Sequence, residues 1–406
     1  MKKEKIIIVI IIAIMLVGIV IAEYMKNSES QRPYGVTISI VDNTTRIISW
    51  SSPQLEVQPY IEWIDATEYN KWDAENVKVT TATVKEHINS NNEIYYRYSV
   101  KLDSLEEDKS YTYRVGGADK KLRSDNAVFN IYHADQEQFS FIHVTDSQGE
   151  TENDFKIWGQ TLDKAIKTLP EAQFIVHSGD LTEDPNVEQQ WKWFFQFSKS
   201  MMGLPFMPTT GNHEQLNEEP TSYHSHFTLP LNGADKLIAE TSYYFEYSNL
   251  LYISMNTEAD IDEQTSWLEQ VLEEHPQKWI VVSMHRGVYG GSRFKEADDW
   301  VKLFDKYGVE LVLQGHNHEY SRSFPLIDGE AVEGQSDDIT EGTVYVTMNA
   351  SGTKFNEKKK DKKYQAVHFQ NDLQMFGTVS VSSTELIYNA YDINGDLLDT
   401  FTIKQK

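Results

Sequence analysis

Five short groups of polar residues in the central part of the chain are of the types that bind metal ions. They are Asp146-Ser-Gln148, Gly179-Asp180, Gly211-Asn212-His213, His285 and Gly315-His316-Asn-His318. Carboxylate, amide and imidazole side chains offer the oxygen and nitrogen ligands of mixed metal sites. One such group alone more often forms a turn or a polar surface than a site. Five in order, each directly after an apolar run, predict a metal centre that these residues share.

The apolar runs that precede these groups are predicted strands, and they alternate with helical patterns. The runs are 139–144, 174–176, 204–207, 250–253, 279–282 and 309–313, and further strand-like segments follow at 343–348, 377–381, 386–391 and 398–403. Between them, apolar residues recur at a period of 3.6 around Trp158, Trp191 and Trp267. Strands alternating with helices indicate an α/β layered domain, here assigned to residues 136–406.

The order of strand and ligand predicts how the centre is assembled. Ligands in open α/β sheets gather at the carboxyl ends of the strands, and the neighbouring glycines permit close backbone approach. The two imidazoles of His316-Asn-His318 are expected to face different metals from an extended segment, because alternate side chains point to opposite sides. Asp180 has two carboxylate oxygens and is the expected bridge between two ions.

The part of the chain before this domain has a different texture. Residues 34–135 contain short segments of period-2 alternation, such as 36–40, 46–50, 95–100 and 110–115. This pattern predicts an all-β sandwich. None of its residues forms a catalytic set, so we interpret it as a structural module.

Residues 1–33 are predicted to be a membrane anchor or signal segment with a linker. Lys2, Lys3 and Lys5 precede an apolar run from Ile6 to Ala22. A spanning helix needs about 17–25 apolar residues, and lysines favour the cytoplasmic side. We therefore expect a cell-membrane protein with the domain of residues 136–406 outside the cytoplasm, or a secreted one if the chain is cleaved after Ala22.

Composition limits the possible partners. The net charge of -25 argues against nucleic-acid binding, because a protein of this charge repels the phosphate backbone. A polyanionic substrate would need local positive charge. The chain has no cysteine, which excludes thiolate catalysis and cysteine zinc sites. The acidic stretch 328–341 and the basic stretch 354–363 are predicted to be exposed loops.

With these five groups, and with Tyr243-Tyr-Phe-Glu-Tyr, Asn256-Thr-Glu258 and the run from Gly315 to Pro325, the sequence resembles the calcineurin-like metallophosphoesterases. Within them it is similar to the purple acid phosphatase-like branch, in which a fibronectin-like sandwich precedes the catalytic domain. The resemblance implies one metal held by Asp146, Asp180 and His318 and a second held by Asp180, Asn212, His285 and His316. It also implies a metal-bridging hydroxide as nucleophile and His213 as the group that steers the phosphoryl group and protonates the leaving oxygen.

Two positions depart from the family pattern. Gln148 stands where the wider superfamily has histidine and purple enzymes have glycine, and Glu183 stands where purple enzymes have tyrosine. Gln148 is predicted to bind the first metal through its amide oxygen, a ligand that suits Mn²⁺ or Fe²⁺; the alternative is a first metal that binds weakly. Without the tyrosinate, the purple colour is expected to be absent. The predicted cofactors are two divalent or trivalent ions, drawn from Fe, Mn and Zn.

The resemblance implies a phosphoric monoester hydrolase acting on a phosphorylated small molecule or an envelope phosphoester. A phosphodiesterase or pyrophosphatase using the same site is an alternative, and so is a non-catalytic surface binding protein on a phosphatase scaffold. His224 and His226 are predicted to be hydrogen-bonded loop histidines rather than cleft residues. Arg286, Tyr289 and Arg293 follow His285. The sequence favours neither substrate contact nor a structural role for these three residues.

Overall fold

The computed structural model describes residues 31–88, 92, 94–215, 220–235, 238–335 and 337–405. The anchor or signal segment predicted for the N-terminus lies outside these residues. Within the described ranges, no helix is both long and apolar enough to cross a membrane.

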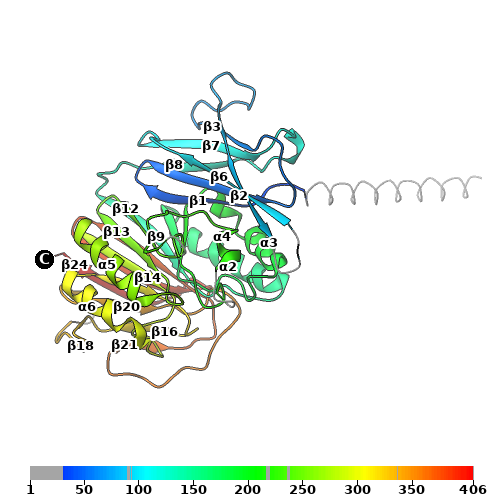
Figure 1. Ribbon diagram of the computed structural model, residues 1–406. Helices are drawn as coiled ribbons and strands as arrows, with labels where there is room; N and C mark the ends of the chain where they lie inside the picture. The colour runs from blue at the N-terminus through cyan, green and yellow to red at the C-terminus, as the bar shows by residue number, and fades with distance from the viewer. Residues whose placement is uncertain are drawn as a thin grey trace, which may run out of the picture.

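The N-terminal unit consists of two four-stranded antiparallel sheets packed face to face (Figure 1). The sheet order is β1-β2-β6-β5 in one sheet and β4-β3-β7-β8 in the other. The strands are β1 Tyr34–Asp42, β2 Thr45–Ser52, β3 Tyr60–Asp65, β4 Lys78–Thr81, β5 Thr83–Ile88, β6 Ile94–Leu102, β7 Lys109–Gly116 and β8 Ala127–Ile131, and the 3-10 turn η1 is Lys120–Leu122. Alternate side chains of both sheets form one core, in which Trp50 stacks on Tyr98 with ring centroids 5.4 Å apart. The predicted sandwich is present, and its strands β1, β2, β6 and β7 contain the four segments singled out by period-2 alternation.

The C-terminal unit is built on two seven-stranded mixed sheets. One has the order β11-β10-β9-β22-β23-β24-β19 and the other the order β12-β13-β14-β15-β20-β16-β21. The strands of the first are β9 Gln138–Val144, β10 Phe174–His177, β11 Phe206–Pro208, β19 Asp338–Ile339, β22 Met375–Ser382, β23 Glu385–Asp392 and β24 Leu397–Lys404. Those of the second are β12 Tyr243–Tyr247, β13 Leu250–Met255, β14 Trp279–Met284, β15 Leu311–Gln314, β16 Tyr320–Ser323, β20 Val344–Thr347 and β21 Gln365–Phe369. A small hairpin, β17 Leu326–Ile327 with β18 Glu330–Ala331, lies outside both.

The two large sheets share one apolar core. Phe174 of the first sheet packs against Phe245 and Tyr247 of the second, with ring centroids 5.7 and 5.3 Å apart. The central strands β10, β13, β14 and β15 are buried along their whole length. Strands buried on both faces are apolar runs rather than alternating ones. This explains why continuous apolar stretches marked them in the sequence.

Helices cover the outer faces of both sheets (Figure 1). Helix α2 (Glu152–Thr168) packs with α3 (Glu188–Phe197) on the first sheet, and α5 (Ile261–Glu274) and α6 (Asp298–Tyr307) cover the second. A capping box between Thr151 and Asp154 starts α2, whose apolar face buries Trp158 and Leu162. The remaining helical segments are α4 Thr221–His224 and the 3-10 turns η2 Lys199–Met202 and η3 Lys295–Ala297. The predicted α/β layered fold is thus observed as helix, sheet, sheet and helix.

The sandwich is joined to the C-terminal unit through β1 and β7. Ile40 belongs to the core of the C-terminal unit, and the Tyr34 hydroxyl donates to the Glu188 carboxylate. The Tyr113 hydroxyl donates to the Met202 carbonyl at 2.6 Å. The sandwich therefore contacts the α3 side of the first sheet.

Candidate metal centre

The predicted ligand groups lie on loops that follow five strands. Strands β9, β10 and β11 are parallel neighbours in one sheet, and β14 and β15 are parallel neighbours in the other. Within each sheet, the carboxyl ends of these strands therefore lie at one edge. Hydrogen bonds join the loops directly: the Asp146 amide donates to the Gly179 carbonyl and the Gly315 amide to the His285 carbonyl, each at 3.0 Å.

Two glycines beside the ligands leave no room for a side chain. A Cβ atom at Gly211 would lie 2.2 Å from Asp180 Oδ1, and one at Gly315 would lie 2.6 Å from Asp146 Oδ2. The carboxylates thus occupy the space that a larger residue would fill. This agrees with the close backbone approach expected from the sequence.

Four ligand residues adopt left-handed backbone conformations. The φ angles are 51° at Asp146, 58° at Asp180, 70° at His316 and 51° at His318. The expectation that His316-Asn-His318 is extended is wrong, because two of its three residues have positive φ. The two imidazoles still belong to different candidate ligand groups, His316 with His285 and His318 with Asp146. Such conformations are uncommon outside glycine and cluster at functional sites, where the surroundings hold them.

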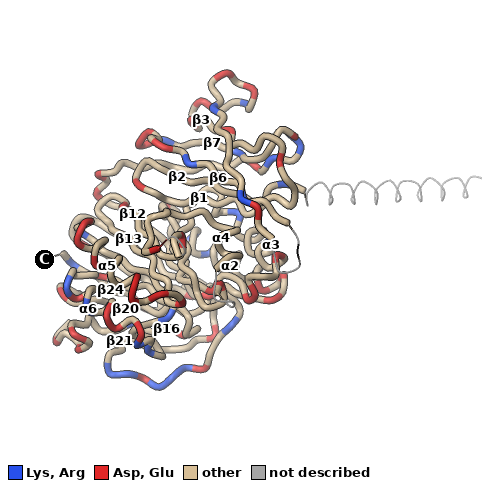
Figure 2. The backbone as a smooth tube through the Cα atoms, viewed as in Figure 1, with Lys and Arg blue, Asp and Glu red and all other residues tan. Residues whose placement is uncertain are grey.

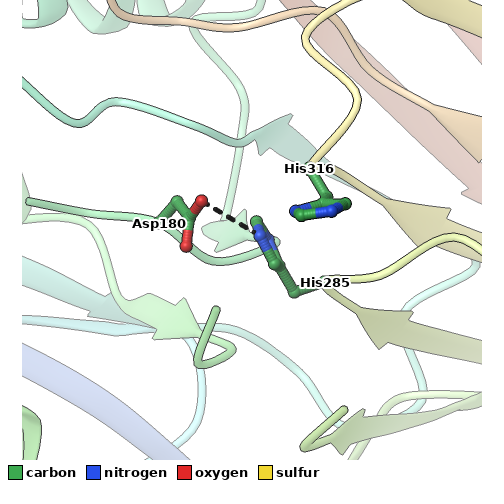
Figure 3. A group of neighbouring side chains, drawn as sticks. All are labelled: Asp180, His285 and His316. Carbon is green, nitrogen blue, oxygen red and sulfur yellow. Dashed lines mark ion pairs between the residues drawn. The ribbon is translucent and has the colours of Figure 1, made fainter. Parts of the chain in front are cut away.

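The side chains form two groups that share Asp180. One contains Asp180, His285 and His316 (Figure 3), and the other contains Asp146, Asp180 and His318; within each, the ligand atoms lie within 4.8 Å of one another. His285 Nε2 lies 3.1 Å from Asp180 Oδ2, and His318 Nε2 lies 3.1 Å from Asp146 Oδ1. Asp180 therefore stands where a bridging carboxylate is required.

The donor set fits metal ions. Asn212 Oδ1 is buried and has no hydrogen-bond partner among the described residues. A buried polar atom without a partner is costly, and a cation would satisfy this lone pair. His285 Nδ1 and His318 Nδ1 each contact a backbone carbonyl at 2.8 Å, that of Ser178 and that of Lys354. This contact directs each Nε2 to the centre, as is usual for metal-binding histidines.

The electrostatics of the centre favour positive charge. Burial raises the pKa of Asp146 and of Asp180, but the facing histidines outweigh it and the pKa of both carboxyls is lowered. Burial lowers the pKa of His285, yet Asp180 and Asp146 raise it to about 10. The pKa of His318 is raised in the same way, against burial, by Asp146. An environment that retains protons on two buried imidazoles also stabilises a metal cation there.

Gln148 reaches the group that contains Asp146 and His318. One orientation of its amide gives both the nitrogen and the oxygen hydrogen-bond partners. In this orientation the nitrogen donates to the backbone carbonyls of Asp180 and Asp146, at 3.2 and 3.3 Å. The amide oxygen then lies 3.2 Å from His318 Nε2 and faces the centre. This orientation is the one that an amide ligand to a metal requires.

His213 lies beside Asp180 without belonging to either group. Its Nε2 is 3.9 Å from Asp180 Oδ2, and its Nδ1 contacts the Glu183 carbonyl at 2.6 Å. The Glu183 carboxylate forms an ion pair with Lys354 Nζ rather than with a candidate metal ligand. Among the described residues, Glu183 joins neither candidate metal group. Nδ1 thus contacts the backbone, and Nε2 is directed toward Asp180.

Three further residues stabilise the site through hydrogen bonds and ion pairs. The sequence did not predict them as part of it. The buried Glu214 carboxylate accepts hydrogen bonds from the amides of Asp180, Leu181 and Gly211 at 2.8 to 2.9 Å. Arg286 Nη1 lies 3.2 Å from His316 Nε2, and the guanidinium forms a two-point ion pair with Glu258. Because Glu214 is next to His213 in sequence, the sequence could have indicated that it belongs to the site. Lys354, whose carbonyl and ammonium contact His318 and Glu183, had no sequence signal beyond a basic loop.

The other residues weighed from the sequence lie away from the ligands. His226 is buried, stacks on Trp191 and contacts Glu188 Oε1 at 3.2 Å, which is the hydrogen-bonded role predicted for it. His224 interacts with the Ala239 backbone and lines a cavity of 720 Å³ between the sandwich and the C-terminal unit. Tyr289 is buried, and Arg293 pairs with Asp298 at 2.8 Å.

Comparisons with known proteins agree with this arrangement. Residues 139–320 match the calcineurin-like phosphoesterase family, and residues 33–132 match the N-terminal domain of purple acid phosphatases. A purple acid phosphatase from yellow lupin seeds has a similar structure, with a TM-score of 0.79 at 17% identity, over 93% of this chain and 75% of that one.

Two Arabidopsis thaliana proteins are similar in sequence. Purple acid phosphatase 18 is 24% identical over 83% of this chain and 75% of its own length. Probable inactive purple acid phosphatase 24 is also 24% identical, over 73% of this chain and 57% of its own length. The chain spans only 38% to 58% of the length of several curated relatives that it matches.

Proposed function

We propose that this chain, which belongs to the calcineurin-like metallophosphoesterases and carries the N-terminal domain of purple acid phosphatases, is a metal-dependent phosphoester hydrolase. The observation that carries the proposal is Asp180, which belongs to two ligand groups at once. Two metal ions bound there, when present, lower the pKa of water and polarise phosphoryl oxygens.

The protein's own residues supply the remaining requirements. Asp180, Asn212, His285 and His316 would hold one ion, and Asp146, Asp180, His318 and the Gln148 amide oxygen the other. His213 presents Nε2 toward the shared carboxylate; in its imidazolium form, the Nε2–H group can hydrogen-bond a phosphoryl oxygen and pass its proton to the leaving alkoxide. The contact between Nδ1 and the Glu183 carbonyl keeps the ring in that orientation.

We propose a phosphoric monoester as the substrate, either a phosphorylated small molecule or an envelope phosphoester. A diesterase or pyrophosphatase would use the same ligands, so substrate comparison decides between them. Because residue 183 is glutamate and pairs with Lys354, a tyrosinate-to-iron charge-transfer band is not expected. Mn²⁺, Fe²⁺ or Zn²⁺ suits the oxygen and nitrogen ligands present.

The test combines elemental analysis with hydrolysis of a chromogenic monoester, the matching diester and pyrophosphate. We expect close to two metal ions per chain, loss of turnover on chelation, and its return when metal is added back. Asp180→Asn should reduce both metal content and turnover, because it weakens the residue common to both groups. Full turnover in Asp180→Asn would contradict the proposal.

A non-catalytic binding role is the competing function, and one observation favours it. A relative that aligns with 73% of this chain bears the name of a probable inactive phosphatase. If metal binds with the expected stoichiometry and no phosphoester is hydrolysed under any metal, the binding role is the better explanation.

We also propose that the hydrolase acts outside the cytoplasm, because lysines precede the apolar run of residues 6–22. Fractionation of cells that express the full chain, with N-terminal sequencing of the product, tests this. Retention of the activity in the cytoplasmic fraction would contradict it.

A further inference from the structure

One surface loop has a charge opposite to that of the protein as a whole. Residues 354–363, here named the lysine loop, contain six lysines and two acidic residues, whereas the whole chain carries a net charge of -25. Residues 356–363 are exposed. Figure 2 shows the loop as a blue stretch at the lower edge of the molecule, on the side opposite the sandwich.

The lysine loop begins at the metal centre. The Lys354 carbonyl contacts His318 Nδ1 at 2.8 Å, and the Asn356 amide donates to the His318 carbonyl at 3.3 Å. Further along, the Lys359 amide donates to Glu319 Oε2 at 2.7 Å, next to that ligand in sequence. The loop therefore runs outward from the ligand His318, and its position relative to the centre is fixed by the backbone.

Most of the loop's positive charge is not neutralised. Lys354 pairs with Glu183 and Lys358 with Asp361. Within the described part of the chain, no acidic group lies within ion-pair distance of Lys359, Lys360, Lys362 or Lys363. The five residues from Lys359 to Lys363 can extend over at most about 18 Å, so these charges can follow an elongated ligand over that length.

We propose that the lysine loop is a binding subsite for the distal phosphates of a polyanionic substrate whose terminal phosphate lies in the metal centre. The inference rests on the proposed hydrolase function and narrows its substrate class to chains of several phosphates. An acidic protein repels such a ligand, and a basic strip that leads away from the centre offsets this repulsion locally. Lysine suits the task because its compact charge on a flexible stem imposes no fixed geometry, unlike the planar fork of arginine.

The experiment measures binding of inorganic polyphosphate to the full chain by calorimetry, at about 50 to 200 mM salt. The test variant is Lys360→Gln with Lys362→Gln and Lys363→Gln. The control variant, Lys71→Gln with Lys120→Gln and Lys121→Gln, removes the same charge from exposed positions of the sandwich. We expect at least roughly ten-fold weaker binding by the test variant at low salt, and a log–log salt slope smaller by about two to three. The control should bind as the wild type does.

Hydrolysis of a small aryl monoester separates this inference from the proposed function. Its kcat/KM should be equal in the three proteins, because such a substrate is too short to reach the loop. Equal polyphosphate binding by wild type and test variant, or equal loss in both variants, overturns the inference even if monoester turnover is normal. Binding to phosphatidylserine vesicles is measured with the same three proteins. If the test variant still binds polyphosphate but no longer binds these vesicles, the inference is overturned in favour of a membrane contact. Absence of all turnover contradicts the proposed function, while the binding data still report on the loop.

Discussion

The ion pair behind His316 offers a sharp test of the metal centre, through Glu258→Gln. Arg286 Nε and Nη2 lie 2.6 and 3.0 Å from the two Glu258 oxygens, and Arg286 Nη1 lies 3.2 Å from His316 Nε2. Glutamine has nearly the same shape, but it removes the charge that holds the guanidinium at two points. The freed positive charge of Arg286 also opposes a cation bound at His316. Both effects lower the affinity of the protein for the ion bound at His316.

The magnitude follows from the position of the pair. Groups that orient a metal ligand typically contribute 10- to 100-fold in metal affinity, about 1.4 to 2.7 kcal/mol. The Glu258 side chain is only 15% exposed, so solvent screens the pair weakly. The control is Asp298→Asn, which breaks the pair with Arg293 at 36% and 44% exposure. That exposed pair contributes only about 0.2 to 1 kcal/mol to stability and contacts no ligand.

The assay is titration of metal-stripped protein with Mn²⁺ or Zn²⁺ against a competing chelator, fitted to two sites. Glu258→Gln should weaken one ion and leave the other close to its wild-type affinity, while Asp298→Asn changes neither. Unchanged affinity for both ions in Glu258→Gln, or equal losses in both variants, would refute the assignment of His316 as a ligand held by Arg286.

Three further predictions concern single residues. His213→Ala should lower kcat by roughly 10²- to 10⁴-fold with the metal content unchanged, as kinetics and elemental analysis can verify; a loss of metal would instead make His213 a ligand. Gln148→Ala should weaken one ion by about ten-fold or more in the same chelator titration, and equal affinity would mean that the amide is not a ligand. Burial raises the pKa of Glu56 from 4.5 to about 7 in the folded protein, so the wild type loses stability as pH rises from about 4.5 to 7. Glu56→Gln, which keeps an acceptor for Trp50 Nε1, should therefore be more stable than the wild type by about 1 to 3 kcal/mol at pH 8 and equal to it near pH 4 in urea unfolding; equal stability at pH 8 would sink this argument.

Much of the fold could be predicted because its signals are local. The strands β9, β10, β13 and β14 are short apolar runs, and the faces of α2 and α3 repeat at 3.6 residues. The strands β3, β4, β5 and β8 of the sandwich and helix α6 were not identified from pattern alone. The exposed β4 and β5 lack a clear alternation, since little of either strand is buried.

The candidate ligands were also readable from the sequence. Each stands within a few residues of a strand end, and the carboxyl ends of parallel neighbours meet at one edge whatever the intervening loops contain. The chain order of the motifs therefore specified which residues would gather. It did not specify their backbone conformation, and the extended segment expected at His316 to His318 was wrong for that reason.

Only the tertiary structure decided what surrounds the ligands. Lys354 pairs with Glu183 across 171 residues of sequence, and Gln148 meets His318 across 170. Other contacts also join segments that are far apart in sequence. They include the face-to-face packing of the two sheets, the Arg286–Glu258 pair behind His316 and the start of the lysine loop at His318. Composition and periodicity describe neighbours along the chain. A contact between distant segments depends on how both sheets pack and where each loop leaves them, and that is set by the folded core as a whole.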